Sequence, residues 1–438
     1  MGLLIIIFSL FLFLQLFLIY RLSGGLLAVP FLIFIYIVLL YLGTLHFYFS
    51  EGHLSFVFVF FMALFYLAGI CLAHLKFNFG RSSISTEQLM IFTPLHRAVL
   101  KFSLITVFLI ALGIAIYRIF EFGIPLFKRN WYTTGIQSST GVLNKLLFNT
   151  GVESLIVMSL ISYGLYKSEK DGRFRSLAAV FFISYLVFQT LNGGKSTAIM
   201  PFVLFGMAIF YCDRKIPRKL LIMAGLCVLV LVLFIGAFWA VSFSPSDILP
   251  IFYERVTSIA AIHLDYVLYG WAPNHSFEFG NTIWLELKRF IAQVTSVPKE
   301  PLFNEFIGNL RVGASLSRVT GVSPELSLFG MAYANLGLLG AILSALVFGY
   351  FVQWINLYLL SRRSMNLFSF TLLVYFMFKL LAYVRGGNTF ITLQTFFIAV
   401  VPAFTIIAIV YFCLALPFPH ALRWRKNRLA LSTRRVNS

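Results

Sequence analysis

Residues 2–20 read GLLIIIFSLFLFLQLFLIY, a run of nineteen residues without a single charge. A helix of this length can cross the hydrocarbon core of a bilayer, which is ~30 Å thick. The run has no basic start and no small-residue cleavage site, both of which a secretory signal peptide would show. We therefore predict that it is retained as a membrane-spanning helix.

Similar apolar runs recur along the chain and determine its fold class. Eleven windows are long enough to span, which predicts an all-α polytopic integral membrane protein with about 11 transmembrane helices. The ninth window, residues 328–360, is long enough to be either one tilted helix or a broken one. The predicted spans are Leu3–Tyr20, Leu26–His46, Leu54–Leu75, Val99–Phe120, Leu143–Tyr166, Ser176–Leu191, Ser196–Cys212, Leu220–Val241, Leu328–Leu360, Met365–Val384 and Phe390–Leu416.

The composition excludes a soluble globular protein. The 438-residue chain is 60% hydrophobic and only 11% charged, which leaves too little polar surface to face water on all sides. Its net charge of +19 would raise the question of nucleic acid in a soluble protein, but here the charges follow the loops. Of 34 basic residues, 21 lie in or beside every second loop or in the tail, which places those loops in the cytoplasm, the N-terminus outside and the C-terminus inside.

The largest loop, residues 242–327, lies outside in this arrangement and holds eight of the 15 acidic residues. Its pattern predicts amphipathic helices over 247–269 and over 281–295, the second capped by Asn281. Both are too short and polar to span, so we expect them to lie along the membrane surface. The chain thus divides into spans one to eight (1–241), the loop (242–327), spans nine to eleven (328–416) and a basic tail (417–438), which we expect to face anionic lipid rather than nucleic acid.

No cofactor is predicted from the sequence. The four cysteines lie in or beside apolar runs, and no metal-binding motif occurs. The stretch Asn192–Thr197 (NGGKST) resembles the end of a phosphate-binding P-loop, but Gln189 stands where that motif needs glycine. A reaction without metal, nucleotide or redox group would have to use energy already stored in its substrate.

Two basic residues stand at the outer ends of predicted spans, each beside a pair of glycines. They are Lys195, after Gly193-Gly194, and Arg385, before Gly386-Gly387. Glycine lets backbone amides approach an anion, and the N-terminus of the following helix adds partial positive charge, so these turns suit a diphosphate. The alternative interpretation is that both are ordinary turns whose long side chains extend to the interface.

Other charged residues divide between the loop and one span. In the fifth span Glu153 predicts a structural ion pair or a proton relay, with Lys379 as a candidate partner. The loop supplies guanidinium groups that could bind phosphate or sugar, and carboxylates or imidazoles that could act as a general base. These are Arg255, Arg289, Arg311 and Arg318, and Glu286, Asp265, Glu325 and His263, of which His263 is expected to be packed.

With these features the chain resembles the Wzy-type polysaccharide polymerases. The resemblance is carried by Phe122–Phe127 (FGIPLF), the turn Gly193–Ser196, and Pro324 followed by Met331–Gly337 (MAYANLG). The layout, many helices with one large outer loop late in the chain, matches over nearly the whole length. Lys195 stands where arginine is commoner in similar turns, which keeps the charge but loses the two-pronged grip on phosphate.

The resemblance implies an enzyme of the bacterial inner membrane that joins undecaprenyl-diphosphate-linked oligosaccharide repeat units into O-antigen or a related polysaccharide at the periplasmic face. It implies a metal-independent transfer, with lipid diphosphate as leaving group, and a chain-length regulator of the Wzz type as a partner. The expected catalytic residues are Glu286, Glu325 and Arg289, and the expected diphosphate- or glycan-binding residues are Lys195, Arg255, Arg311 and Arg385.

Two other functions fit a protein of this layout. An O-antigen ligase would transfer finished glycan to lipid A core, and a histidine late in the loop would favour it, but neither His263 nor His275 lies late. A flippase or other transporter would carry charges through the core of several helices and show two similar halves. The predicted spans carry few charges, and the sequence shows no internal repeat.

Overall fold

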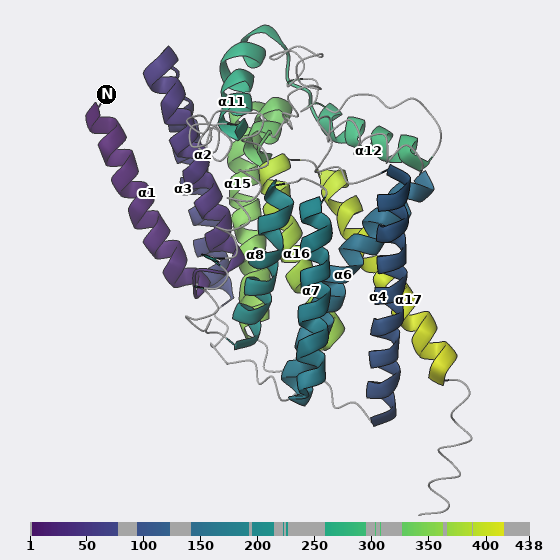
Figure 1. Cartoon of the computed structure of the whole chain (residues 1–438). Coiled ribbons are helices and arrows are strands. Elements are labelled where there is room, and N and C mark those ends of the chain that lie inside the picture. Colours follow the sequence, from purple (N-terminus) through teal and green to yellow (C-terminus); the bar gives the residue numbers. More distant parts are fainter. Residues whose placement is uncertain are drawn as a thin grey trace, which may run out of the picture.

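The computed structural model is helical throughout its described part and contains no strand there (Figure 1). It describes residues 2–77, 94–122, 142–191, 195–213, 222, 225–226, 259–294, 303, 307, 326–361, 366–387 and 389–415. Within these ranges some side chains, including those of Lys195 and Arg289, lie outside the description. The all-α class predicted from the sequence is therefore confirmed for this part of the chain.

Ten of the eleven predicted spans coincide with long helices. Boundaries differ from the predicted ones by several residues at most, because hydropathy marks the apolar centre of a helix better than its polar ends. The eighth predicted span lies outside the described residues except for 222 and 225–226. The ten helices are α1 (Gly2–Ser23), α2 (Val29–Glu51), α3 (Ser55–Lys76), α4 (Pro94–Phe122), α6 (Val142–Glu169), α7 (Gly172–Leu191), α8 (Lys195–Asp213), α15 (Leu328–Ser361), α16 (Leu367–Gly386) and α17 (Thr389–Ala415).

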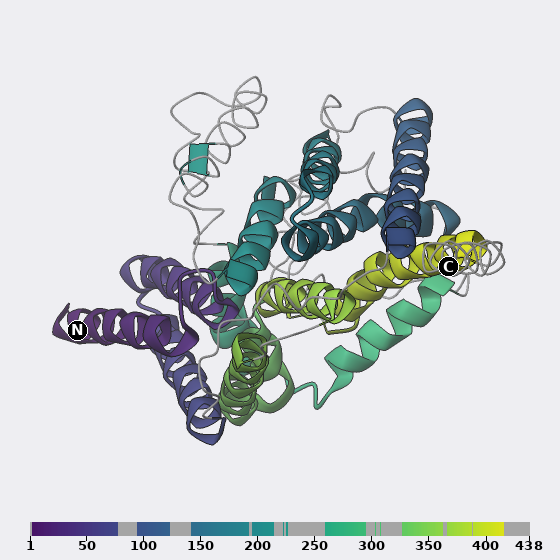
Figure 2. The ribbon, with the colours of Figure 1, turned by 90° about the horizontal axis from the view of Figure 1, so that it is seen from below.

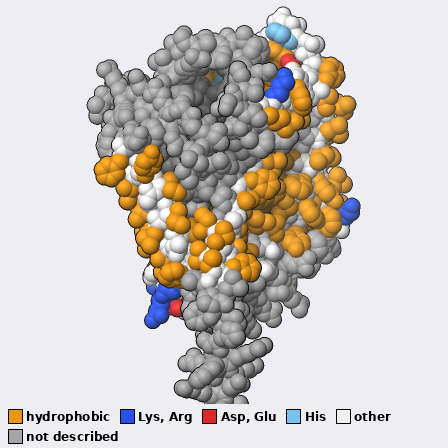
Figure 3. Space-filling model, turned by 90° about the vertical axis from the view of Figure 1, so that its right-hand side faces the viewer, with side chains coloured by type: hydrophobic (Ala, Val, Ile, Leu, Met, Phe, Trp, Pro, Cys, Tyr) orange, Lys and Arg blue, Asp and Glu red, His pale blue; other side chains and the backbone are white. Residues whose placement is uncertain are grey.

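Six of the described helices, α1, α2, α3, α4, α15 and α16, are long and apolar enough to cross a membrane. Their outward faces remain hydrophobic: Leu3, Phe13 and Phe17 on α1 are all more than half exposed. Figure 3 shows the same on the flank of the bundle, where hydrophobic side chains dominate the described surface. Such a surface is stable in lipid and not in water, so the chain has the character of a multi-pass membrane protein.

The bundle is held together by close helix contacts, the most extensive of which joins α3 to α15. A Cβ atom added at Gly69 would collide with the backbone of Leu346 and Tyr350, and one added at Gly349 would collide with the backbone of Tyr66. Glycine at both positions lets the two helices approach until their backbones touch, which is how helices pack when lipid supplies no hydrophobic drive.

Polar side chains at one end of the bundle bind the C-terminal end of α1. The Asn356 side chain donates to the Ser23 carbonyl at 3.1 Å, and Gln353 donates to the Leu22 carbonyl at 3.1 Å. The Tyr211 hydroxyl on α8 in turn donates to Asn356 Oδ1 at 2.8 Å. Since the last carbonyls of a helix have no partner within it, this buried network satisfies them and fixes α1 against α8 and α15.

The same end of the bundle carries basic residues. Lys167 at the end of α6 lies 2.5 Å from Asp213 at the end of α8, and Tyr163 donates to the same carboxylate at 3.2 Å. Arg21, at the end of α1, and Lys76, at the end of α3, lie at this end too. The N-terminus, by contrast, lies at the opposite end together with the described helices of the large loop (Figure 1). The alternation inferred from loop charges therefore matches the direction of the described helices.

The large loop folds onto the upper end of the bundle. Its described helices are α11 (Ile259–Asp265), a π-helical turn (Tyr266–Trp271), a 3-10 turn (Ala272–Asn274) and α12 (Asn281–Val294). The helix predicted over 247–269 is confirmed from residue 259, as an α-helix to Asp265 and as a π-helical turn from there on; residues before 259 lie outside the description. Gly280, not Asn281, supplies the first carbonyl of α12, which Ile283 and Trp284 bind at 3.1 Å.

The loop and the start of α15 share a small hydrophobic core separate from the main one. Trp271 is its centre, stacked on the His275 ring with centroids 5.4 Å apart and meeting Phe303 edge to face. The described part of the loop is therefore packed against the bundle. The buried residues of this core are Val267, Trp271, Phe303, Ile307, Leu326, Met331 and Ala334.

Candidate functional site

The site is built around a break in α15, which resolves whether the ninth predicted span is continuous. Leu336 and Gly337 leave helical geometry, with Gly337 at φ +62° and ψ −153°, a region that glycine reaches without strain. A Cβ atom at Gly337 would lie 2.8 Å from the Phe277 ring, so the position needs glycine for space as well. The break divides α15 into a short outer segment, Leu328–Asn335, and a long lower helix.

The segment before α12, residues 276–280, binds the backbone groups that the break frees. The amides of Glu278 and Phe279 donate to the carbonyls of Ala334 and Asn335, each at 3.0 Å. The Asn335 side chain accepts from the Gly280 amide at 2.8 Å and donates to the Thr282 hydroxyl at 2.6 Å. Helix α12 is thus attached to the break by hydrogen bonds that an unbroken α15 could not offer.

Helix α12 buries its polar face and exposes its apolar one. Thr282 and Glu286 are 1% and 2% exposed, whereas Ile283, Trp284 and Ile291 are each about half exposed. The sequence predicts the two faces but not which of them meets the protein. α12 lies beside α17 and α15 at the upper end of the bundle (Figures 1 and 2), so its apolar face is free to contact the membrane interface.

Glu286 is consequently a buried carboxylate that points toward the bundle and not toward solvent. Arg289 follows it by three residues, so its Cα lies on the same face of α12. Of the predicted catalytic residues only the Glu286 side chain is described, since the side chain of Arg289 and the whole of Glu325 lie outside the description.

The predicted diphosphate-binding residues are placed only in part. Arg385 is half-buried in the last turn of α16, at the same end of the bundle as α12. Lys195 begins α8, so the expected helix N-terminus is present, but its side chain is not described. Arg255 and Arg311, like Arg318, lie outside the described residues.

The glycine pair after Arg385 has a different role from the one predicted. Gly387 adopts φ +70°, and its amide donates to the Tyr383 carbonyl at 2.7 Å, which caps the C-terminus of α16. This amide is occupied and cannot bind an anion. The expectation that Gly386-Gly387 presents backbone amides to a diphosphate is therefore wrong for Gly387, whereas the Arg385 side chain, near a helix C-terminus, is placed where cations are favoured.

A polar cluster lies inside the bundle below this end. Glu153 on α6 lies 3.7 Å from Lys379 on α16, which confirms the ion pair expected from the sequence. Tyr375 and Tyr185 donate to the two oxygens of the same carboxylate at 2.8 Å and 3.1 Å. These bonds join α6, α7 and α16, so the arrangement is that of a structural pair in a low-dielectric environment.

Two other loop candidates are explained by packing. His263 is 1% exposed, as expected for a packed histidine. Asp265, a candidate base, instead accepts from the Ser55 hydroxyl and lies 2.8 Å from His53 Nδ1, so it joins the loop to the turn between α2 and α3. These two partners of Asp265 belong to the α2–α3 turn and to the start of α3, and not to α12.

A shallow apolar depression of about 550 Å³ lies between α1 and the end of α2. Figures 1 and 2 show α1 on the opposite side of the bundle from α12, so a depression lined by α1 and the end of α2 does not belong to the Glu286 site. Its lining suits a lipid chain more than a sugar, because no charged side chain contributes to it. The lining residues are Gly2, Ile5, Ile6, Tyr48, Phe49 and Gly52.

No protein family, curated protein or solved structure matches this chain. A buried carboxylate on an interfacial helix, with cations at the same end of the bundle, can accept a proton from a hydroxyl and stabilise a departing anion close to the membrane.

Proposed function

We propose that this protein joins undecaprenyl-diphosphate-linked oligosaccharide repeat units into a surface polysaccharide of the O-antigen type. The observation that carries the proposal is Glu286, which is 2% exposed on the protein-facing side of an interfacial helix. In this proposal a lipid-linked sugar enters beside α12 and brings its hydroxyl to this carboxylate, while its lipid anchor remains in the bilayer. The arrangement of many apolar helices with one large loop late in the chain also supports the proposed function.

The proposed orientation has eleven spans, the N-terminus and the 242–327 loop in the periplasm, and the C-terminus in the cytoplasm of a bacterial inner membrane. It is supported by Arg21, Lys76 and Lys167, which lie at the end of the bundle opposite α12. Basic residues of short loops favour the cytoplasmic side.

In the proposed reaction the terminal hydroxyl of one lipid-linked unit attacks the anomeric carbon of the growing chain. A new C–O bond forms there as the bond to the lipid diphosphate breaks, and Glu286 or Glu325 takes the hydroxyl proton. The leaving diphosphate gains negative charge in the transition state. Fixed cations aimed at it lower the barrier, and Arg289, Lys195, Arg385, Arg255 and Arg311 are assigned this role.

A deletion strain tests the reaction class. Surface glycan with only a single repeat unit supports the proposal, glycan that is not attached to lipid A core indicates a ligase, and build-up of lipid-linked units in the cytoplasm indicates a flippase. Complementation then tests the site. Lys195→Ala and Arg385→Ala should each raise the barrier by about 2–4 kcal/mol and shorten the polymer ladder. Full ladders from both variants at equal protein level would contradict the cation assignment.

The orientation is tested by cysteine labelling in intact spheroplasts. Ser276 is exposed in the described part of the large loop, and Gly172 is exposed at the opposite end of the bundle. In a background without the native cysteines, Ser276→Cys should react with an impermeant maleimide before lysis, and Gly172→Cys only after it. The reverse order would place the large loop in the cytoplasm and would contradict the proposal.

A further inference from the structure

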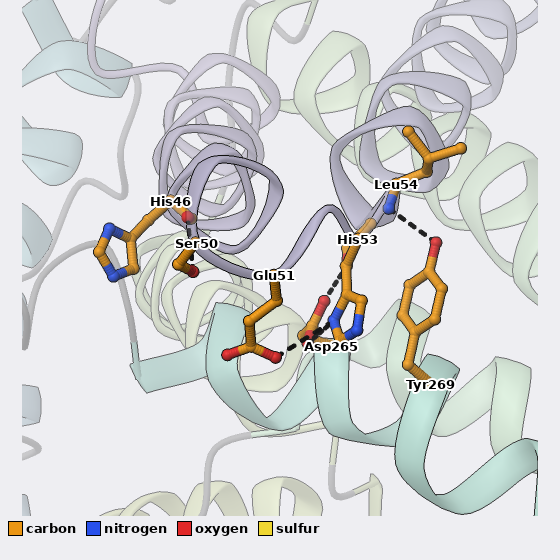
Figure 4. Close-up of polar contacts among 8 residues, drawn as sticks. His46, Ser50, Glu51, His53, Leu54, Asp265 and Tyr269 are labelled. Carbon is orange, nitrogen blue, oxygen red and sulfur yellow. Dashed lines mark hydrogen bonds and ion pairs between the residues drawn. The ribbon is translucent and has the colours of Figure 1, made fainter.

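The turn between α2 and α3 and the helix α11 together form a cluster of metal-ligating side chains. Nitrogen or oxygen atoms of Glu51, His53 and Asp265 lie within 4.8 Å of one another. In Figure 4 the Glu51 and His53 side chains converge on the Asp265 carboxylate, while the neighbouring His46 ring points away. The cluster lies outside the Glu286 site, and its assignment does not depend on the proposed function.

The distances suit a small divalent cation. His53 Nδ1 lies 2.8 Å from Asp265 Oδ2 and 3.5 Å from Glu51 Oε2. Neighbouring ligands of tetrahedral zinc are separated by about 3.4 Å, since each lies about 2.0–2.2 Å from the metal. His53 and Asp265, now at hydrogen-bonding distance, would have to separate by about 0.6 Å to reach this spacing, and the Glu51 side chain, which is about half exposed, can adjust to it.

The surroundings hold two of the three ligands in place. The Ser55 hydroxyl donates to Asp265 Oδ1, which leaves Oδ2 turned toward His53. The His53 ring stacks on the Tyr269 ring, with centroids 4.1 Å apart and planes within 5°, and the Tyr269 hydroxyl accepts from the Leu54 amide at 2.7 Å. Partners of this kind orient metal ligands in proteins and raise their affinity.

The ligand set selects the class of cation. One imidazole and two carboxylates suit zinc and similar transition ions, whereas calcium and magnesium prefer oxygen ligands alone. Three protein ligands leave a fourth position for water. We infer that Glu51, His53 and Asp265 bind one zinc-type divalent cation, which links the large loop to the α2–α3 turn.

The test uses the full-length protein in detergent, stripped of metal, mixed with equimolar Zn²⁺ and passed over a desalting column before elemental analysis. Wild type should retain about one zinc per chain and unfold at a higher temperature than the stripped protein. His53→Ala and Glu51→Gln should each reduce retained zinc at least tenfold, while His46→Ala, the matched control, should not. Glu51 is the safer variant, because its exposed side chain contributes little to folding.

Three results would overturn the inference. They are a stripped wild type that retains no zinc, zinc retained equally by the Glu51→Gln/His53→Ala double variant, and retention of Ca²⁺ in preference to Zn²⁺. None of them bears on polymer formation, which the deletion strain measures separately.

Discussion

The two ends of the bundle differ in the kind of polar side chain that they bury. At the lower end, Asn356, Gln353 and Tyr211 are neutral, and their bonds complete the end of α1. At the upper end a helix breaks at Gly337, a π turn follows α11, and the carboxylate of Glu286 is buried. Neutral groups that close a helix end stabilise a scaffold, whereas a buried carboxylate costs stability. In the proposed function, the lower end therefore holds the fold and the upper end carries the chemistry.

The largest expected effect is on activity at the upper end. Glu286→Gln keeps the shape of the side chain but removes the proton acceptor, so glycan polymerisation should fall roughly 10²–10⁴-fold. Ladder formation in a complemented deletion strain measures it, with protein level checked on the same membranes. Glu278→Gln is the control, because Glu278 already accepts from the Asn281 side chain at 2.8 Å and glutamine can do the same. Full polymer ladders from Glu286→Gln would contradict the assignment of the reaction to the upper end.

The next largest effect is on stability and concerns the ion pair between Glu153 and Lys379, inside the bundle. Lys379→Met leaves the Glu153 carboxylate inside the bundle with only its hydrogen-bonding partners, which should lower the free energy of unfolding by about 3 kcal/mol. Thermal unfolding in detergent measures the loss. The double variant Glu153→Gln/Lys379→Met removes both charges and should recover most of the stability. A single variant as stable as wild type would show that the pair does not contribute to the scaffold.

A smaller loss is expected at the lower end. Asn356→Ala removes the donor to the Ser23 carbonyl and the acceptor of the buried Tyr211 hydroxyl, at a cost of about 2 kcal/mol. Activity per folded molecule should not change, since this end serves only the fold. Lower activity at matched folded protein would place function at both ends. Gln353→Ala, which removes fewer bonds, should cost less.

The smallest effect tests the break in α15. Gly337→Ala introduces a side chain at φ +62° against the Phe277 ring and should cost about 1 kcal/mol. Polymerisation should fall along with it, because α12 is attached at this point. Gly113→Ala in α4 is the matched control: its Cβ meets nothing within 4 Å, so it should be neutral or slightly stabilising. Equal behaviour of the two variants would argue that the break is incidental.

The sequence predicts helices better than it predicts the site. Hydropathy locates ten long helices because burial in lipid is a property of each segment alone. The partner of Glu153 could be proposed from the sequence because few other charges lie in the spans. The break at Leu336–Gly337 could not be decided, since one glycine is equally common within an unbroken membrane helix.

Two features of the upper end depend on long-range contacts and have no local signal. The pattern of α12 defines a polar and an apolar face, but only the position of α15 and α17 decides that Glu286 turns inward. Likewise, His53 and Asp265 are separated by 212 residues, so no motif spacing could show that they meet. A search for metal motifs therefore misses a cluster assembled by the fold.

The bonds from Glu278 and Phe279 to Ala334 and Asn335 join the segment before α12 to the first segment of α15. The first eight residues of α15 are covalently part of a membrane helix but share hydrogen bonds and a hydrophobic core with the large loop. Any displacement of the loop that preserves those bonds must carry this short segment with it, with Gly337 as the pivot. If the proposed function holds, entry of a second lipid-linked glycan would require rotation about this one residue and no unfolding of the helix below.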